Sequence, residues 1–403
     1  MDTHRIVAFC ILSTLLGGTG AIAQETREEA QRKQREEKQQ AVEAYEANAL
    51  ERALKAVETG GIPFITRDGV YAKLGSITTG SGFAYGAGFR TQRLFSGDAA
   101  LDVWGGASIK GYWAAEARVR FPRLAGGHIQ AEGYGRRYDY PQEDYFGLGP
   151  DSPRSAQADF RLRAQTFGAR AAVRVAPVVA IGGGVEYIDP RVSDGKDKAL
   201  VSIGEQFDDA SAPGLSAQPN YLRSIAFVDV DWRRPLNARN GGWYRAELSH
   251  YGDRDLSTYS FTRLDVDVRQ FVSFLSERRV LVGRVAASTS DTADGQQMPF
   301  YLMPTLGGNE TLRGFRDYRF RAPHALLLQA EYRFEVWSGL DAALFYDAGK
   351  VAMRRADLNL NDLESDYGFG FRFNTDNGIV LRVDAAFGSR DGKHLWIVFG
   401  GRF

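Results

Sequence analysis

An arginine and two carboxylates near the carboxyl end of the chain have the types and spacing to form a strong ion pair. Arg313 stands in Gly307–Arg321, a run rich in glycine, arginine and aromatic residues without helical or alternating period, which predicts a specialised loop. Glu331 and Asp347 follow on two successive segments. Because a guanidinium fork suits bidentate recognition of a carboxylate, we expect Arg313 to fold back and pair with Asp347, with Glu331 nearby.

The two segments that carry these carboxylates alternate between apolar and polar residues. In 326–336 the polar positions are Gln329, Glu331, Arg333 and Glu335, and in 340–349 they include Asp341 and Asp347. Alternation with period two and a charged second face predicts strands with one face toward apolar surroundings and the other toward water.

Residues for enzyme chemistry are not arranged together in the sequence. There is no G-x-S-x-G, P-loop or H-E-x-x-H motif, and the histidines after the amino terminus are too scattered to predict a metal site: His128, His250, His324 and His394. Asp265 and Asp267 could be an acid/base pair. Because no nucleophile stands beside them, we favour a role as ion-paired residues in the wall of a barrel lumen. We therefore expect no catalytic residue, no cofactor and no enzyme activity.

The amino-terminal part differs from the rest. Residues 1–23 have the charged, apolar, small-residue order of a signal peptide, which would remove Cys10, the only cysteine. Residues 24–61 are rich in Glu, Gln, Arg, Lys and Ala up to Gly60, and predict a charged periplasmic helix and linker. The whole chain has 50 basic and 50 acidic residues, so its charge gives no reason to expect a nucleic-acid partner.

From residue 62 to 403 the sequence predicts one β domain. Sixteen candidate strands are expected at 70–77, 82–94, 99–108, 111–121, 127–138, 158–172, 178–188, 221–232, 242–251, 257–271, 279–288, 325–336, 339–349, 366–374, 378–387 and 394–403. Short links alternate with longer ones, as in bacterial outer-membrane barrels with short periplasmic turns and long outer loops. Charges of both signs recur at every second position, which fits a polar lumen better than the outside of a soluble sandwich. The predicted fold is all-β, a sixteen-stranded antiparallel transmembrane barrel.

The chain from Asp68 to Phe403 resembles the BamA/TamA outer-membrane superfamily, also called the bacterial surface antigen family. The family's R-G-[FY] loop tip, folded back into the lumen, is matched by Arg313, Gly314 and Phe315. An inward glutamate and an F-x-D-x-G pattern on the following strands are matched by Glu331 and by Phe345, Asp347 and Gly349. The resemblance implies that Arg313 meets these carboxylates inside the barrel.

Two further motifs match the same family. Tyr145–Gly149 has the aromatic-G-x-G signature of an outer loop, and Asp231–Arg233 with Gly241–Gly242 matches the family's fourth periplasmic turn. Most relatives carry POTRA domains before the barrel. Residues 24–61 are too few for one, so this chain is expected to be a member lacking them.

The carboxyl end resembles the signal by which outer-membrane barrels are recognised for assembly. Phe399 and Phe403 share one face of the last strand, and the implied partner is the BAM machinery during biogenesis. Gly400 and Gly401 interrupt the strand that closes on the first one, and glycine weakens strands by about 0.5–1 kcal/mol each relative to alanine. This pair is either a bend at the rim or a deliberately weak lateral seam.

The resemblance implies a bacterial outer-membrane protein, in contact with lipid, that inserts or translocates a polypeptide substrate. The alternative is a plugged or narrow diffusion channel or a structural barrel without insertase activity. Residue patterns alone do not distinguish the two.

Overall fold

The computed structural model describes residues 68–233, 239–275, 277–375 and 378–399. The expected signal peptide and the charged helix over residues 24–61 lie outside these ranges. No helix in the described ranges has the length and apolar character needed to cross a membrane.

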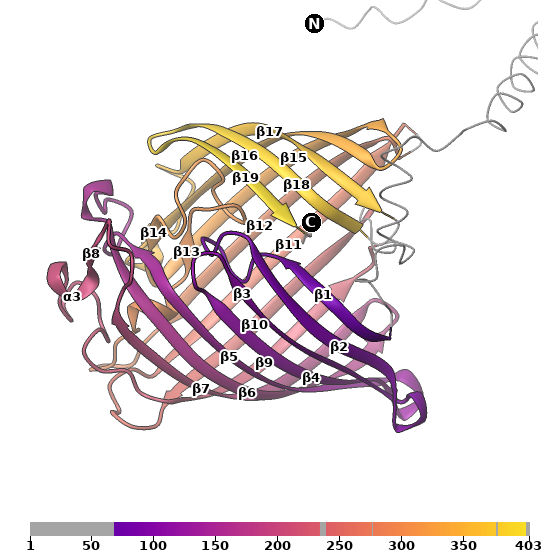
Figure 1. Cartoon of the computed structure of the whole chain (residues 1–403), viewed down its shortest axis with the longest axis horizontal. Helices are drawn as coiled ribbons and strands as arrows, with labels where there is room; N and C mark the ends of the chain where they lie inside the picture. Colours follow the sequence, from indigo (N-terminus) through magenta and orange to yellow (C-terminus); the bar gives the residue numbers. More distant parts are fainter. Residues whose placement is uncertain (1–67, 234–238, 276, 376–377, 400–403) are drawn as a thin grey trace, which may run out of the picture. The chain divides into compact units, whose positions relative to one another are not determined.

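Antiparallel strands dominate the described chain (Figure 1). The long strands are β1 (Gly69–Gly75), β2 (Ala84–Leu94), β3 (Ala99–Ser108), β4 (Trp113–Leu124), β5 (Ile129–Tyr145), β6 (Ala158–Ala176), β7 (Val179–Asp194), β9 (Tyr221–Asp231), β10 (Gly241–Asp253), β11 (Phe261–Phe274), β12 (Arg279–Asp291), β15 (His324–Trp337), β16 (Leu340–Ala352), β17 (Glu364–Thr375), β18 (Gly378–Ser389) and β19 (Gly392–Phe399). Each overlaps one of the sixteen predicted segments, although some run further than predicted, so the predicted fold class is confirmed.

Short elements lie in the connections. The sequence did not predict the two-residue strands β8 (Val201–Ser202), β13 (Thr305–Leu306) and β14 (Phe320–Arg321), the helix α3 (Ile203–Gln206), or the 3-10 turns η1 (Phe95–Gly97), η2 (Ala125–Gly127), η3 (Arg154–Ala156), η4 (Phe300–Leu302) and η5 (Arg355–Asp357). Pieces of two to four residues are too short to show a period.

Neighbouring strands in the sequence pair with each other around a nearly closed barrel. Continuous antiparallel ladders run from β1 to β7, on to β9, through β12 to β15, and then to β19. Among the described residues no ladder joins β19 to β1, which leaves a seam between the first and last strands. The long loops lie at one end of the barrel, to the left in Figure 1.

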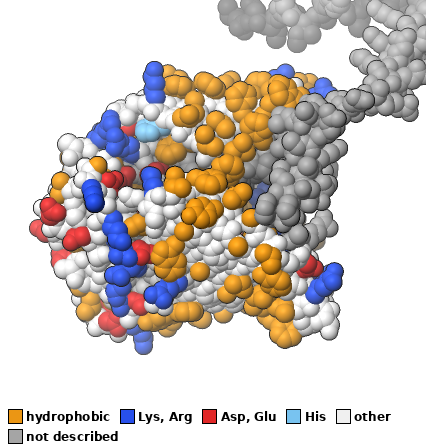
Figure 2. Space-filling model, in the orientation of Figure 1, with side chains coloured by type: hydrophobic (Ala, Val, Ile, Leu, Met, Phe, Trp, Pro, Cys, Tyr) orange, Lys and Arg blue, Asp and Glu red, His pale blue; other side chains and the backbone are white. Residues whose placement is uncertain are grey.

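The two faces of the strands differ as the alternation predicts. On β11, Leu264 and Val272 point outward and are exposed, whereas Asp267 on the other face pairs with arginines on its own and the next strand. Apolar side chains cover much of the outer surface over the strands (Figure 2). The larger buried apolar clusters lie instead where the loops pack, around residues such as Phe315 and Phe300. This arrangement suits a barrel with lipid outside and a polar lumen.

Candidate functional site

The loop between β12 and β15 turns back on itself before it reaches the lumen. Its two arms pair as β13 and β14, and Gly307 and Gly308 at the turn have φ angles of 114° and 96°, a region that favours glycine. A side chain on Gly307 would also place its Cβ 2.2 Å from the carbonyl oxygen of Arg316. These glycines therefore let the two arms approach closely enough to present a compact tip.

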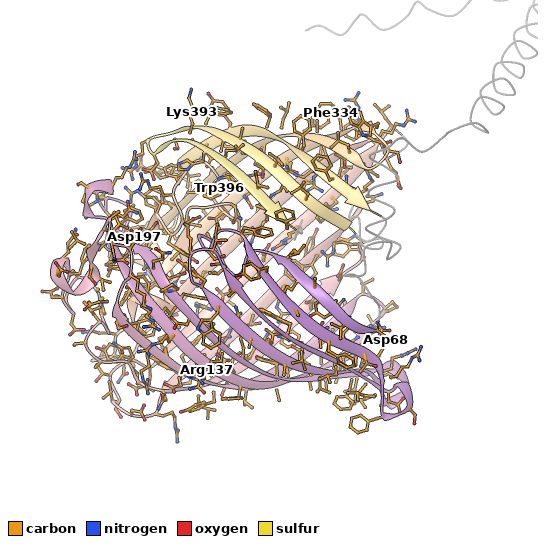
Figure 3. All side chains as sticks on the ribbon, in the orientation of Figure 1. Asp68, Arg137, Asp197, Phe334, Lys393 and Trp396 are labelled. Carbon is orange, nitrogen blue, oxygen red and sulfur yellow. The ribbon has the colours of Figure 1, made fainter. Side chains whose placement is uncertain are left out.

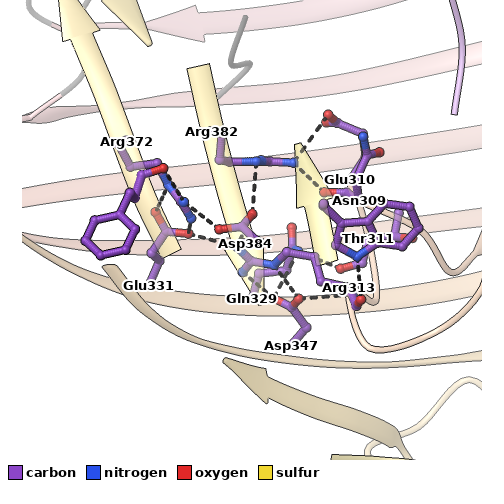
Figure 4. A network of polar contacts seen from close by, with 12 residues as sticks. Asn309, Glu310, Thr311, Arg313, Gln329, Glu331, Asp347, Arg372, Arg382 and Asp384 are labelled. Atoms are coloured by element: carbon purple, nitrogen blue, oxygen red, sulfur yellow. Dashed lines mark hydrogen bonds and ion pairs between the residues drawn. The ribbon is translucent and has the colours of Figure 1, made fainter. Parts of the chain in front are cut away.

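Arg313 lies at this tip and is buried (Figure 4). Its Nε and Nη2 donate hydrogen bonds to the two carboxylate oxygens of Asp347, each over 2.7 Å. Its Nη1 donates to Glu331 over 3.0 Å, and the guanidinium carbon lies 3.5 Å from the ring centre of Phe345. Burial alone would lower the pKa of Arg313, but the negative charges of Asp347 and Glu331 outweigh it and raise the pKa, so the guanidinium stays charged.

Glu331 is shared by three arginines. Arg372 donates to both of its oxygens, over 3.1 and 2.7 Å, and Arg333 donates to one of them over 2.6 Å. Arg372 also donates to Asp384 over 2.5 Å, and Asp384 lies 3.6 Å from Arg313. Because a buried charge is costly unless it is paired, these groups depend on one another across strands β15 to β18.

The backbone of the tip is held separately from the arginine side chain. The indole nitrogen of Trp396, which points inward from β19 in Figure 3, donates to the carbonyl of Arg313 over 2.6 Å. The side-chain amide of Gln329 donates to the carbonyl of Thr311 over 2.7 Å. The tip is thus fixed to both the last strand and the strand that follows the loop.

Gly314 fills a position with no room for a side chain. An added Cβ would lie 2.5 Å from the Cβ of Asp366 and 3.2 Å from that of Ser389, which also donates a hydrogen bond to the Gly314 carbonyl. Gly349 is similar, because a Cβ there would lie 2.7 Å from the carbonyl oxygen of Leu326. The two motif glycines therefore permit close packing, the first of loop against wall and the second of strand against strand.

Phe315 anchors the tip in an apolar cluster rather than in the ion-pair network. It is fully buried and meets Phe320 edge to face at 5.2 Å. The rest of this cluster is Leu306, Leu312, Ala322, Ala325, Leu327 and Val351. The three residues of the motif thus have different roles. Arg313 forms ion pairs, Gly314 allows the loop to approach the wall closely, and Phe315 packs in an apolar cluster.

The aromatic-G-x-G segment meets the same loop at its base. The backbone N–H of Gly149 donates to the carbonyl of Arg321 over 2.8 Å, and Phe146 lies under the guanidinium of Arg319 at 5.0 Å. The other matched turn is self-contained, since Arg233 pairs with Asp231 over 2.7 Å. Only the first of these two motifs therefore belongs to the loop site.

The ends of the barrel sheet approach each other at one point. A Cβ on Gly75 of β1 would lie 3.3 Å from the Cβ of Phe399 on β19, and the Phe399 ring meets Phe83 edge to face at 5.7 Å. Three residues of the expected seam and assembly signal lie outside the described ranges: Gly400, Gly401 and Phe403.

Asp265 and Asp267 are tied into the wall of the lumen. Asp265 pairs with Arg263 over 2.8 Å and Asp267 with Arg284 over 2.9 Å. Within the part of the chain that the structure describes, no group of three or more His, Cys, Asp or Glu residues is placed to hold a metal ion. Both carboxylates therefore lie in an arginine-paired wall.

Sequence reasoning did not single out four residues of the network: Arg372, Arg382, Asp384 and Trp396. Each stands at an inward position of β17, β18 or β19, and Arg382 donates to the carbonyl of Asn309 in the loop over 2.5 Å. Charged or aromatic residues on the inner face of the last strands were the available signal. What the sequence does not reveal is which inward positions face the loop tip.

Comparisons with known proteins agree with the motifs. Residues 235–393 match the Omp85 superfamily domain. The fold is similar to BamA from Haemophilus ducreyi lacking POTRA domains 1–3, with a TM-score of 0.60, 10% identity, and coverage of 83% of this chain and 68% of that one. It is also similar to CdiB from Escherichia coli, with a TM-score of 0.57, 13% identity and coverage of 83% and 62%.

A comparison of the sequence with curated proteins gives no match. At 10% and 13% identity the two structural likenesses concern the fold, while the domain match covers the loop, its motif and the strands that hold it. Residues 235–393 therefore hold an Omp85 superfamily domain, as the loop and strand motifs within them predicted, and the barrel is one of the bacterial outer membrane.

Proposed function

We propose that this barrel inserts or translocates polypeptides at the outer membrane, with a substrate engaged where β1 and β19 part. The observation that carries the proposal is the seam. Successive long strands are joined by ladders all around the sheet, whereas no ladder joins β1 to β19 in the described ranges. β1 is also the shortest of the long strands, with 7 residues. Fewer backbone hydrogen bonds make this pair the one that opens at least cost.

The contents of the lumen favour a lateral route over a straight pore. One cavity of about 500 Å³ lies at the short-turn end and another of about 310 Å³ lies beside the loop, and Arg245 lines both. The second cavity is bounded by the loop residues Thr305, Leu306 and Thr311. A loop held by buried ion pairs therefore stands in the path along the barrel axis. The alternative function, a plugged or narrow diffusion channel, requires these two cavities to be connected so that ions or small solutes can pass.

The test is a disulfide that links β1 to β19 across the seam. Gly75→Cys combined with Phe399→Cys places the two Cβ atoms close to the spacing of about 3.5–4.5 Å that a disulfide needs. The oxidised protein is expected to lose insertion of an outer-membrane barrel substrate in proteoliposomes and to regain it on reduction. The matched control is Ala84→Cys with Ser108→Cys, which face each other in the continuous β2–β3 ladder.

Planar-bilayer conductance is measured on the same samples. Full insertion activity in the oxidised seam variant would exclude the lateral route. Steady conductance without any insertion activity would favour the channel instead. Because Gly75 has a φ of 139°, which strains other residues, the reduced double variant must first match wild type in activity.

A further inference from the structure

A group of arginines lies on the outer face of the barrel wall, away from the loop site. Arg163 on β6 stands directly opposite Arg191 on β7, and Arg137 on β5 stands one row nearer the short turns, opposite Gln165. All three arginines are exposed. We call Arg137, Arg163 and Arg191 the arginine patch. In Figure 2 basic side chains gather toward the long-loop end of this wall, and Figure 3 labels Arg137 on it.

The positive charge of this patch is only partly neutralised by the protein. Arg191 pairs with Asp189 over 2.7 Å and also donates hydrogen bonds to the carbonyl of Gln218 and the side chain of Asn220. Asp139 stands directly opposite Arg163 in the β5–β6 ladder, but its carboxylate pairs with Arg161. Arg137 and Arg163 make no hydrogen bond or ion pair through their side chains within the described residues. Side chains directly opposite each other in an antiparallel pair have Cβ atoms about 4.5–5.5 Å apart, and like charges there are destabilising. The Arg163–Arg191 pair would therefore be stabilised by an anion between the two guanidinium groups.

The height of the patch on the wall identifies the kind of anion. On the same outward face, toward the short turns, the next row contains Gln165 and Asp189, and the row after it contains the exposed rings of Phe167 and Tyr187. Beyond these lie Val185, Ile181 and Val173. Ten residues separate Arg163 from Val173. At about 3.3 Å per residue on a strand tilted about 40°, this is about 25 Å, the height of the apolar band of such barrels.

The patch thus sits where the apolar band ends on the side of the long loops, which is the outer leaflet. From this position we propose that Arg137, Arg163 and Arg191 bind the phosphate groups of an outer-leaflet lipid headgroup, a phosphorylated glycolipid of the lipid A type. Arginine binds phosphate through paired N–H donors, and exposed guanidinium groups in two neighbouring rows can reach two phosphates of one headgroup. The acyl chains would lie along the Phe167–Tyr187 row. The site would fix the wall formed by β5, β6 and β7 in the outer leaflet.

The test uses the purified full chain, folded in a neutral detergent. Bound lipid is measured by native mass spectrometry during titration with lipid A that carries two phosphates, and with the same lipid after removal of both. Wild-type protein is expected to bind the phosphorylated form at least tenfold more tightly. The double variant Arg137→Gln/Arg163→Gln is expected to lose this preference, because it removes the two guanidinium groups of the patch that make no hydrogen bond or ion pair within the described residues.

The matched control removes the same charge elsewhere. Arg123→Gln/Arg254→Gln changes two exposed arginines, one next to the last residue of β4 and one in the loop after β10, and is expected to bind like wild type. Heat-dependent gel mobility shows that each variant is folded. Equal binding of both lipids by wild type, or unchanged binding by the patch variant, would overturn the proposal. So would competition by inorganic pyrophosphate at the same concentration as lipid A, since the site would then recognise a free anion rather than a headgroup.

Discussion

Asp347 receives two parallel hydrogen bonds of 2.7 Å from Arg313, across 34 residues of sequence and from a loop to a strand. Neither side chain is accessible to solvent, with exposed fractions of 2% for Arg313 and 0% for Asp347. This pair therefore joins the loop to the barrel wall in surroundings where neither charge has water as a substitute partner.

Replacing Arg313 by alanine is expected to free the loop. Removal of one partner from a buried ion pair costs about 3–5 kcal/mol, because the other charge is stranded. The barrel should still assemble, since its ladders do not depend on the tip, but cleavage of the loop by chymotrypsin should rise and insertion activity should fall. Arg313→Lys should restore the loop only in part, because one ammonium group cannot make both bonds to Asp347.

The control for this change is Arg354→Ala. Arg354 pairs with Asp357 in another loop, but the two side chains are 78% and 45% exposed. Pairs of this kind contribute about 0–1 kcal/mol, so loop cleavage and activity should stay at wild-type levels. If the loop of Arg313→Ala is cleaved no faster than that of wild type, other contacts, such as the one from Trp396, are sufficient to hold the tip.

Gly314→Ala is expected to displace the tip without any change of charge. Its added Cβ would lie 2.5 Å from the Cβ of Asp366, a distance that the backbone must relieve by moving. Overpacking of this kind costs about 1–3 kcal/mol, and the loop should become protease-sensitive. The second-site change Asp366→Gly should restore protection. Gly283→Ala is the matched control, since nothing lies within 4 Å of its added Cβ. If Gly314→Ala stays protected from the protease, the barrel wall around Asp366 moves to accommodate the methyl group and the loop tip does not.

The sequence predicts the fold of this protein better than the contacts inside it. Sixteen strands were predictable because each alternates strongly, for instance Leu264 against Asp265, and because turns interrupt the pattern. Asp347 was predictable as a partner of Arg313 because it stands at an inward position shortly after the loop. Asp384 and Trp396 were not, since they lie 71 and 83 residues from Arg313 and approach it only through the curvature of the wall.

Asp317 gives the loop a dependence on pH. Burial, helped by the charge of Asp144 and opposed by Lys110, raises the pKa of Asp317 from its ordinary value of 3.8 to about 7. The folded loop then binds a proton that the unfolded chain has already released, so stability is fully present below about pH 4, falls as pH rises toward 7, and is constant above that. Chymotrypsin cleavage of the loop should therefore increase between pH 5 and pH 8.

Asp317→Asn is the variant that isolates this effect. Its uncharged amide should give a cleavage rate that changes less than that of wild type over the same pH range, once the pH dependence of the protease itself has been measured on an unfolded substrate. Asp362→Asn, in the loop between β16 and β17, is the control because Asp362 is exposed, and its profile should match wild type. A wild-type slope that persists in Asp317→Asn would assign the titration to another group.

Glu331 is expected to matter more for stability than any single arginine around it. It accepts hydrogen bonds from Arg313, Arg333 and Arg372, so Glu331→Gln leaves three buried cations with one negative neighbour fewer. We expect a fall in the temperature at which the barrel loses its folded gel mobility, and a larger fall than for Arg313→Ala. Glu335→Gln, four residues along the same inward face of β15, is the control and should leave that temperature unchanged.

A double change tests whether the loss is one of charge balance. Arg372→Gln alone should also destabilise the barrel, because it leaves Asp384 with less compensation. If the network is held by balanced charges, the loss of unfolding free energy in Glu331→Gln/Arg372→Gln should be smaller than the sum of the losses in the two single variants. The difference, which is the coupling energy, should be about 0.5–3 kcal/mol. Strictly additive losses would instead mean that Glu331 and Arg372 act independently of each other.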